Sequence, residues 1–127
     1  MSFFLDNMVS PRIVGALKEL GEDVEALRER FAPNCPDSVW IEALGNSGGI
    51  LITVDNRIVS RPPERMMLKQ ANITSFFLRN FFVKMKFWDQ ATWLIRNWPR
   101  IEATAGDFTR GAAFTVQQNG KMSSLSV

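Results

Sequence analysis

The chain has 127 residues, 46% hydrophobic and 22% charged, which is typical of one globular domain with its own core. It contains no His and a single Cys, Cys35, which excludes imidazole catalysis, His-ligated zinc and an internal disulfide. The formal net charge is +2, yet residues 1–56 hold nine acidic and four basic residues, while residues 57–100 hold two acidic and nine basic ones. This asymmetry suits an enzyme that holds a cation and acts on a polyanion, although surface charge that clusters by chance or balances a partner protein gives the same pattern.

The first half of the sequence alternates short apolar runs with amphipathic stretches. Strands are predicted at residues 2–5, 23–27 and 49–54. Helices are predicted from Ser10-Pro11 to Gly21 and from Asp37 to Gly45, with a connector at 27–34. The third strand is almost wholly apolar, as expected for a central parallel strand buried on both faces. The order β-α-β-α-β therefore predicts a parallel sheet with right-handed crossovers.

The second half predicts a helix at residues 64–71, a strand at 73–78 and a helix that Pro99 ends. Between the last two, apolar residues alternate with lysines in FFVKMKFW, which predicts an extended segment. The Asn119-Gly120 pair predicts a hairpin turn near the C-terminus. No linker divides the chain, so we expect one domain over residues 1–127, with a core at about 3–100 and a C-terminal hairpin or tail at 101–127.

Three tryptophans, Trp88, Trp93 and Trp98, fall in or beside the last predicted helix. They could form a binding surface, but buried core or an interface between copies is the commoner role of such residues. A homodimer is therefore among the expected states of the protein.

No apolar run approaches the about 18 residues that a membrane span needs. The apolar N-terminal residues are interrupted by Asp6 and have no basic segment ahead of them, unlike a signal peptide. Together with the single Cys, these features predict a cytoplasmic protein that does not enter a membrane.

Two predicted strands stop abruptly at an Asp-Asn pair, Asp6-Asn7 and Asp55-Asn56. In a parallel sheet, ligands bind beyond the carboxyl ends of the strands, so neighbouring strands would place Asp6 and Asp55 in one crevice. Asp37, at the start of the second helix, can point to the same end of the sheet. Each acid also has an ordinary interpretation, as a turn residue for Asp6 and Asp55 and as a helix N-cap for Asp37.

Converging carboxylates repel one another unless a cation lies between them. Mg²⁺ or Mn²⁺ prefers oxygen ligands and pairs naturally with phosphate, so the three acids predict a metal site that cleaves a phosphodiester. Glu42 is an outside candidate for a fourth ligand, because it lies five residues beyond Asp37 and points to a different side of the helix.

The stretch FFLDNMVSPRIVGALKELGEDVEAL, followed by DSVWIEAL and GILITVDNRI, resembles the PIN-like ribonuclease superfamily. The likeness is strongest to compact members with a D-x-x-x-S-P opening, an Asp at the second helix and a T-x-D strand end, several of which are toxins of VapBC-type toxin–antitoxin modules. The resemblance covers residues 3–100. It implies a PIN-like three-layer α/β/α sandwich with a mainly parallel sheet, an acidic Mg²⁺ or Mn²⁺ pocket, an RNA substrate and a cognate antitoxin.

By this resemblance, the catalytic and metal-binding residues are Asp6, Asp37 and Asp55. The residues that it implies beside the substrate are Asn7, Ser10, Arg12 and Arg57. In a nuclease of this kind, Arg61 would also bind substrate, and Arg65 and Lys69 would lie near the phosphates. Better-known PIN enzymes usually carry four acids, and this chain offers three. The pocket would then be a reduced active site or the remnant in a non-catalytic module that binds nucleic acid or a partner.

A phospho-acceptor receiver domain is a further alternative, because it also places acids around Mg²⁺ at the ends of parallel strands. Such a domain usually needs adjacent acids just after its first strand, and here Asp6 is followed by Asn7. The nuclease interpretation is the stronger of the two.

Overall fold

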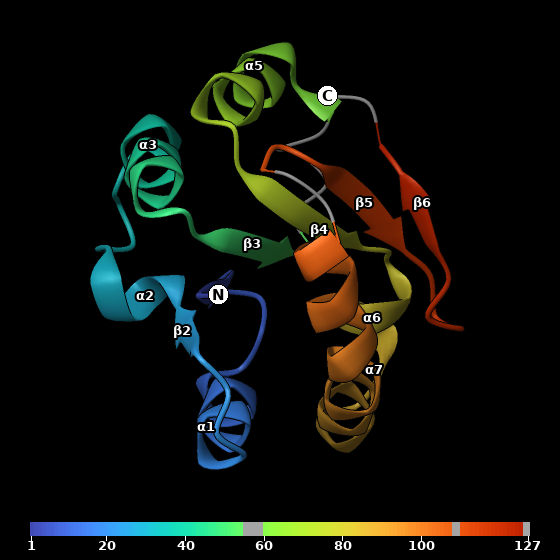
Figure 1. Ribbon diagram of the computed structural model, residues 1–127. Helices are drawn as coiled ribbons and strands as arrows, with labels where there is room; N and C mark the ends of the chain where they lie inside the picture. Colours follow the sequence, from blue (N-terminus) through green and yellow to red (C-terminus); the bar gives the residue numbers. More distant parts are fainter. Residues whose placement is uncertain (55–59, 108–109, 126–127) are drawn as a thin grey trace.

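The computed structural model describes residues 1–54, 60–107 and 110–125, and one six-stranded sheet forms its centre (Figure 1). The strand order is β2-β1-β3-β4-β5-β6. The strands are β1 (Phe3–Leu5), β2 (Val24–Ala26), β3 (Ile50–Thr53), β4 (Thr74–Leu78), β5 (Ala113–Val116) and β6 (Met122–Ser124). Every neighbouring pair is parallel except β5 and β6, which are antiparallel. This confirms the predicted α/β class with a mainly parallel sheet.

Helices cover both faces of the sheet and make a three-layer arrangement (Figure 1). One face carries α1 (Pro11–Glu19), α6 (Phe81–Lys84) and α7 (Phe87–Asp107), and the other carries α3 (Asp37–Ser47) and α5 (Pro62–Ala71). The short helix α2 (Leu27–Arg30) leads from β2 toward α3. Within the described ranges, no helix is both long enough and apolar enough to cross a bilayer.

The alternation of side chains along the central strands builds two separate cores. Phe3 and Leu5 pack into the core beneath α1 and α7, whereas Phe4 packs into the core beneath α3 and α5. All residues of β1, β3 and β4 are buried, because both of their faces are covered. The near-continuous apolar runs in the sequence are a direct consequence of this double burial.

The segment FFVKMKFW is helical, so the predicted extended segment is wrong. Residues Phe81–Lys84 form α6, and α7 begins at Phe87. The alternating residues Val83 and Phe87 are each 44% exposed, whereas Phe82 is fully buried. An alternating pattern indicates a strand only when one of its two sets is buried, and here neither set is.

Two predicted helix ends are also wrong. Gly45 lies inside α3, which continues to Ser47 and ends at Gly48 in a left-handed conformation (φ 73°). Pro99 lies inside α7, which continues to Asp107. Trp98 and Ile101, on either side of Pro99, are buried, so apolar packing offsets the backbone hydrogen bond that proline cannot make.

The C-terminal hairpin forms as the Asn-Gly turn predicts, and it is part of the central sheet. β5 pairs with β4 in parallel, and Phe114 and Val116 lie in the core. The three tryptophans differ in burial. Trp93 and Trp98 are buried, as expected for core residues, whereas Trp88 is 78% exposed and is available for a binding surface or an interface.

Candidate functional site

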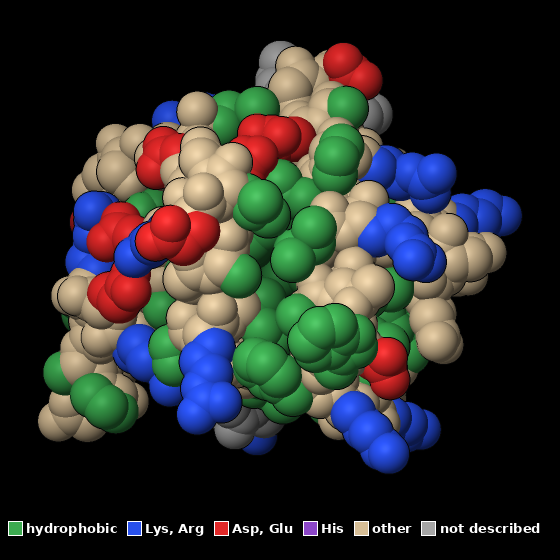
Figure 2. Space-filling model, turned by 90° about the horizontal axis from the view of Figure 1, so that it is seen from below, with side chains coloured by type: hydrophobic (Ala, Val, Ile, Leu, Met, Phe, Trp, Pro, Cys, Tyr) green, Lys and Arg blue, Asp and Glu red, His purple; other side chains and the backbone are tan. Residues whose placement is uncertain are grey.

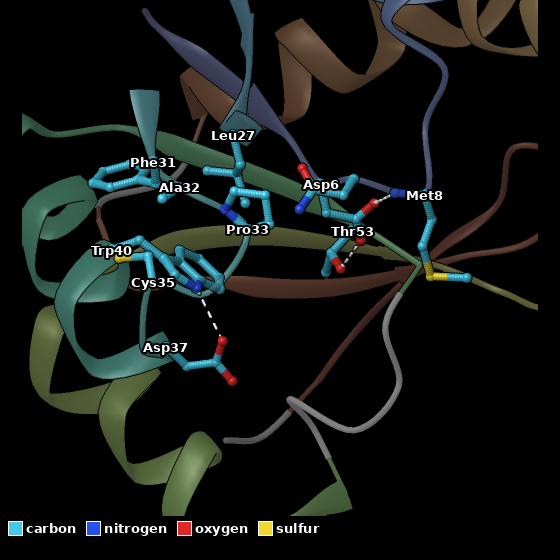
Figure 3. Close-up of a pocket in the computed structure, with 11 residues that line it drawn as sticks. Asp6, Met8, Leu27, Phe31, Ala32, Pro33, Cys35, Asp37, Trp40 and Thr53 are labelled. Carbon is cyan, nitrogen blue, oxygen red and sulfur yellow. Dashed lines mark hydrogen bonds between the residues drawn. The ribbon is translucent and has the colours of Figure 1, made fainter. Parts of the chain in front are cut away.

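A pocket of about 240 Å³ lies at the carboxyl ends of β1 and β3 (Figure 3). The chain passes from β1 to β2 on one side and then crosses to β3 on the other, so the strand order reverses at this point. Such a switch point opens a crevice beyond the strand ends, where ligands bind in open parallel sheets. The described residues that line the pocket are Asp6, Asn7, Met8, Leu27, Phe31, Ala32, Pro33, Cys35, Asp37, Trp40 and Thr53.

Asp6 directly follows β1 and is only 7% exposed. Its Oδ1 accepts a hydrogen bond from the Met8 backbone N–H at 2.9 Å. Its Oδ2 accepts from the Val54 backbone N–H at 2.9 Å and from the Thr53 hydroxyl. These donors compensate for burial of the carboxylate and fix it between the ends of β1 and β3.

Asp37 is the first residue of α3 and lines the same pocket. The helix N-cap is Pro36, so the alternative interpretation of Asp37 as the N-cap is wrong. Its Oδ1 instead accepts a hydrogen bond from the indole N–H of Trp40 at 2.9 Å. The side chain is exposed, so the other carboxylate oxygen has access to solvent and ligand.

The pocket has an acidic and an apolar part (Figure 3). The Asp6 carboxylate lies beside Met8 and Thr53, while Asp37 lies beside the indole of Trp40. Phe31, Pro33 and Cys35, from the segment between α2 and α3, form the apolar wall. The site therefore combines carboxylate oxygens held by hydrogen bonds with an apolar wall.

A family model described as a PIN like domain matches residues 1–80, more than half of the chain. The chain belongs to the PIN-like domain family. The match spans β1 to β4 and includes both Asp6 and Asp37. A search of curated proteins and a search of solved structures each found no match. The PIN-like family includes nucleases, and those nucleases typically use divalent metals.

Two carboxylates of the pocket are candidate ligands for the divalent metal that PIN-like nucleases typically use. Asp6 and Asp37 supply carboxylates, and Mg²⁺ is commonly bound through one or two carboxylates with waters completing its shell. Among residues 1–54, 60–107 and 110–125, no three His, Cys, Asp or Glu side chains lie close enough together to form a metal-binding cluster. Asp55, the third predicted ligand, follows Val54 in the sequence and falls outside the described residues.

The predicted substrate-binding residues occupy different places. Asn7 lines the pocket. Ser10 caps α1, where its hydroxyl accepts from the Arg12 backbone N–H at 3.2 Å. Arg12 is exposed, with its guanidinium carbon 6.0 Å from the centre of the Phe87 ring. Arg61 is the exposed N-cap of α5. Their roles stay predictions, and Arg57 falls outside the described residues.

Two residues considered for the site lie elsewhere. Glu42 faces a groove between α3 and α5, beside Met67 and Gln70, and does not line the Asp6 pocket. Lys69 lies beside Asn72 and Gly111, where β4 and β5 begin, at the opposite end of the sheet. Rotation about the helix axis turns Glu42 away from the pocket, whereas Lys69 is distant because it lies in the last turn of α5, at the far end of that helix.

Thr53 is the site residue that sequence reasoning missed. It is fully buried, and its hydroxyl donates to the Asp6 carboxylate. The available signal was the T-x-D strand end itself, because a hydroxyl at the last position of a buried strand needs a hydrogen-bond partner.

Proposed function

We propose that this protein is a metal-dependent endoribonuclease that hydrolyses RNA phosphodiesters, and that it acts as the toxin of a VapBC-type toxin–antitoxin module. Membership of a family that includes nucleases supports the proposal. The observation that carries it is the pairing of Asp6 and Asp37 in one pocket at the switch point of the sheet. This is where a parallel α/β fold places a ligand site.

Asp6, Asp37 and Asp55 would hold the Mg²⁺ or Mn²⁺ ion. When bound, such an ion supplies Lewis acidity, which activates water and offsets the charge that builds up on phosphate oxygens. The donor set suits it, because carboxylate oxygens are the preferred ligands of these hard cations.

The other residues of the chain hold these acids in position. Met8, Thr53 and Val54 fix the Asp6 carboxylate with three hydrogen bonds, and Trp40 fixes Asp37. Outer contacts of this kind orient ligands and reduce the reorganisation needed during reaction. Exposed Arg12 and Arg61 are suited to attract the phosphates of RNA.

A toxin of this type needs a protein that neutralises it, so we propose an antitoxin as its partner and a homodimer as a possible assembly state. The basic charge of residues 57–100, with nine basic and two acidic residues, suits an acidic partner as well as RNA.

The test is cleavage of a mixed RNA pool by the purified chain, free of any partner, with Mg²⁺ or Mn²⁺. We expect cleavage that EDTA stops and that an Asp6→Ala/Asp55→Ala double variant, confirmed to be folded, has lost. Cleavage that persists in the folded variant would contradict the assignment of the site.

A non-catalytic binding module is the second candidate. It is favoured by the engagement of both Asp6 oxygens with protein donors, which accounts for this buried carboxylate without a cation. RNA binding that is unchanged by EDTA, with no cleavage in any metal, would support this alternative over the nuclease.

A further inference from the structure

Two aromatic rings are exposed at the start of α7. Phe87 is 44% exposed and Trp88 is 78% exposed, although large aromatic side chains usually lie in the core. Figure 2 shows that the molecule exposes hydrophobic side chains along the middle of the face seen from below, with Lys and Arg side chains on both sides and Asp and Glu side chains mainly to the left and at the top. The rings therefore lie on an accessible surface rather than in a packed interior.

Basic side chains lie close to this pair, two of them in the chain and one in space. Lys84 and Lys86 are exposed directly before it in the chain, and the Arg12 guanidinium lies 6.0 Å from the centre of the Phe87 ring. Residues 79–100 carry five basic side chains and one acidic one, Asp89. Flat rings between basic side chains are the arrangement that binds single-stranded nucleic acid, because bases stack on the rings while phosphates pair with the cations.

The aromatic pair follows the same edge of the sheet as the Asp6 pocket, because α1 comes after the carboxyl end of β1 and α6 and α7 come after that of β4. Met8 lines the pocket and is 52% exposed, and Ser10 then caps α1. Arg12, in the first turn of α1, lies with its guanidinium carbon 6.0 Å from the centre of the Phe87 ring. A strand of RNA that leaves the pocket past Met8 would therefore meet Arg12 and then the two rings.

We propose that Arg12, Lys84, Lys86, Phe87 and Trp88 form a binding track for single-stranded RNA that leads to the Asp6 pocket. The proposal rests on the proposed ribonuclease function and adds to it a surface outside the pocket that holds the substrate. A second copy of the chain fits the track less well, because a symmetric contact would bring the same cations together.

The test measures the binding of a fluorescently labelled single-stranded oligonucleotide in EDTA, where metal-dependent cleavage is absent. Removing one stacking ring with Trp88→Ala should weaken binding about five- to a hundredfold, whereas Trp88→Phe should restore much of it. Lys86→Ala should reduce the slope of log affinity against log salt by about 0.7. Leu20→Ala and Met66→Ala are the matched controls, because these hydrophobic side chains are 62% and 60% exposed outside the track.

Trp88 also provides a direct optical signal. The other three tryptophans are buried, at 8% exposure or less, so quenching of the exposed indole by RNA should be lost in Trp88→Phe, and any signal that remains reports on Trp40 in the Asp6 pocket. Unchanged affinity in both Trp88→Ala and Lys86→Ala would overturn the track, and so would a loss of dimer in Trp88→Ala without a loss of RNA binding. Because binding is measured without metal, failure of the track is distinguishable from failure of the nuclease assay.

Discussion

Asp6 accepts hydrogen bonds from three groups in two segments of the chain: Met8, two residues on, and Thr53 and Val54 at the end of β3. It therefore stabilises the junction of the two central strands as well as the pocket. Substituting Asp6 would leave buried donors without a partner, which typically costs about 1–3 kcal/mol. For this reason, a loss of activity on substitution of Asp6 is informative only when folding is measured alongside it.

The variant Thr53→Val tests whether Thr53 acts by positioning the Asp6 carboxylate rather than by binding the metal itself. Valine keeps the shape of threonine but removes the hydroxyl that donates to Asp6. We expect Mn²⁺ affinity, measured by titration, to fall about 10–100-fold, as is typical for loss of an outer-shell partner. Thr53→Ser, which keeps the hydroxyl, should recover most of it. Equal affinity in Thr53→Val and the unmodified protein would contradict a positioning role.

At this scale, the sequence revealed the acids better than the groups around them. Asp6 could be predicted because an apolar run that stops at a carboxylate marks a strand end, and Asp37 because it begins a helical pattern. Thr53 was missed, because threonine is ordinary in strands and only its position in the T-x-D strand end indicated that its hydroxyl needs a partner. The wall of Phe31, Pro33 and Cys35 was equally hidden, because a segment without periodicity does not indicate which side chains face a pocket.

Among the helices, α3 and α5 pack closely at a glycine. A Cβ added to Gly45 would lie 2.6 Å from the backbone oxygen of Ala71, closer than such atoms approach without a shift of the backbone. In α1, a Cβ at Gly15 meets nothing within 4 Å.

These two helical glycines form a matched pair. Gly45→Ala should lower the free energy of unfolding by about 1–3 kcal/mol through overpacking. Gly15→Ala should raise it by about 0.5–1 kcal/mol, because alanine favours the helix. Chemical denaturation of both variants is the measurement. A gain in stability from Gly45→Ala would show that α3 and α5 are not packed as described.

Helix α7 contains a carboxyl group with a raised pKa. Burial raises the pKa of Glu102, and the neighbouring charge of Glu22 raises it further, while the N-terminal amino group opposes this. The folded state therefore holds the Glu102 proton more tightly than the unfolded state does. The contribution of Glu102 to the stability of the folded state is complete below the ordinary glutamate pKa of about 4.3. This contribution is lost as the pH rises through the raised pKa.

Glu102→Gln should remove this loss of folding stability at higher pH. We expect the variant to be more stable than the unmodified protein at pH 7, and the difference to shrink toward pH 4, as measured by thermal unfolding across that range. A difference that grows as the pH falls would have the wrong sign for this account.

Strands and helices could be predicted from the sequence where burial determines the pattern of apolar residues. The strands within 2–5, 49–54 and 73–78 are apolar because both sheet faces are covered, so their composition alone was sufficient. The short helix α6 and the continuation of α7 beyond Pro99 could not be predicted. Both depend on tertiary packing, of Phe82 in one case and of Trp98 and Ile101 in the other, which overrides local preference.

At the scale of the whole molecule, the order of the strands determines where the acidic residues of the first half of the chain lie. The sheet places β1 beside β3, so the acidic first half of the chain forms a pocket at the switch point. A parallel sheet was expected from the β-α-β-α-β order, but the adjacency of β1 and β3 was only a condition for bringing Asp6 and Asp55 together. The parallel pairing of β5 with β4 was not predicted, because the long helix α7 connects them and the hairpin motif does not indicate which strand it joins.

The most direct test of the acidic pocket as the active site compares two carboxylates of α3. Asp37 lines the pocket and Glu42 faces the groove toward α5, and both are exposed at the helix surface. We would measure the cleavage rate of a defined single-stranded RNA with Mn²⁺ for Asp37→Asn and Glu42→Gln, each of which removes one charge with little change in shape. We predict a loss for Asp37→Asn beyond the about 10–100-fold typical of outer-shell substitutions, and an unchanged rate for Glu42→Gln. Full activity in Asp37→Asn, or equal losses in both variants, would contradict the assignment of the active site to this pocket.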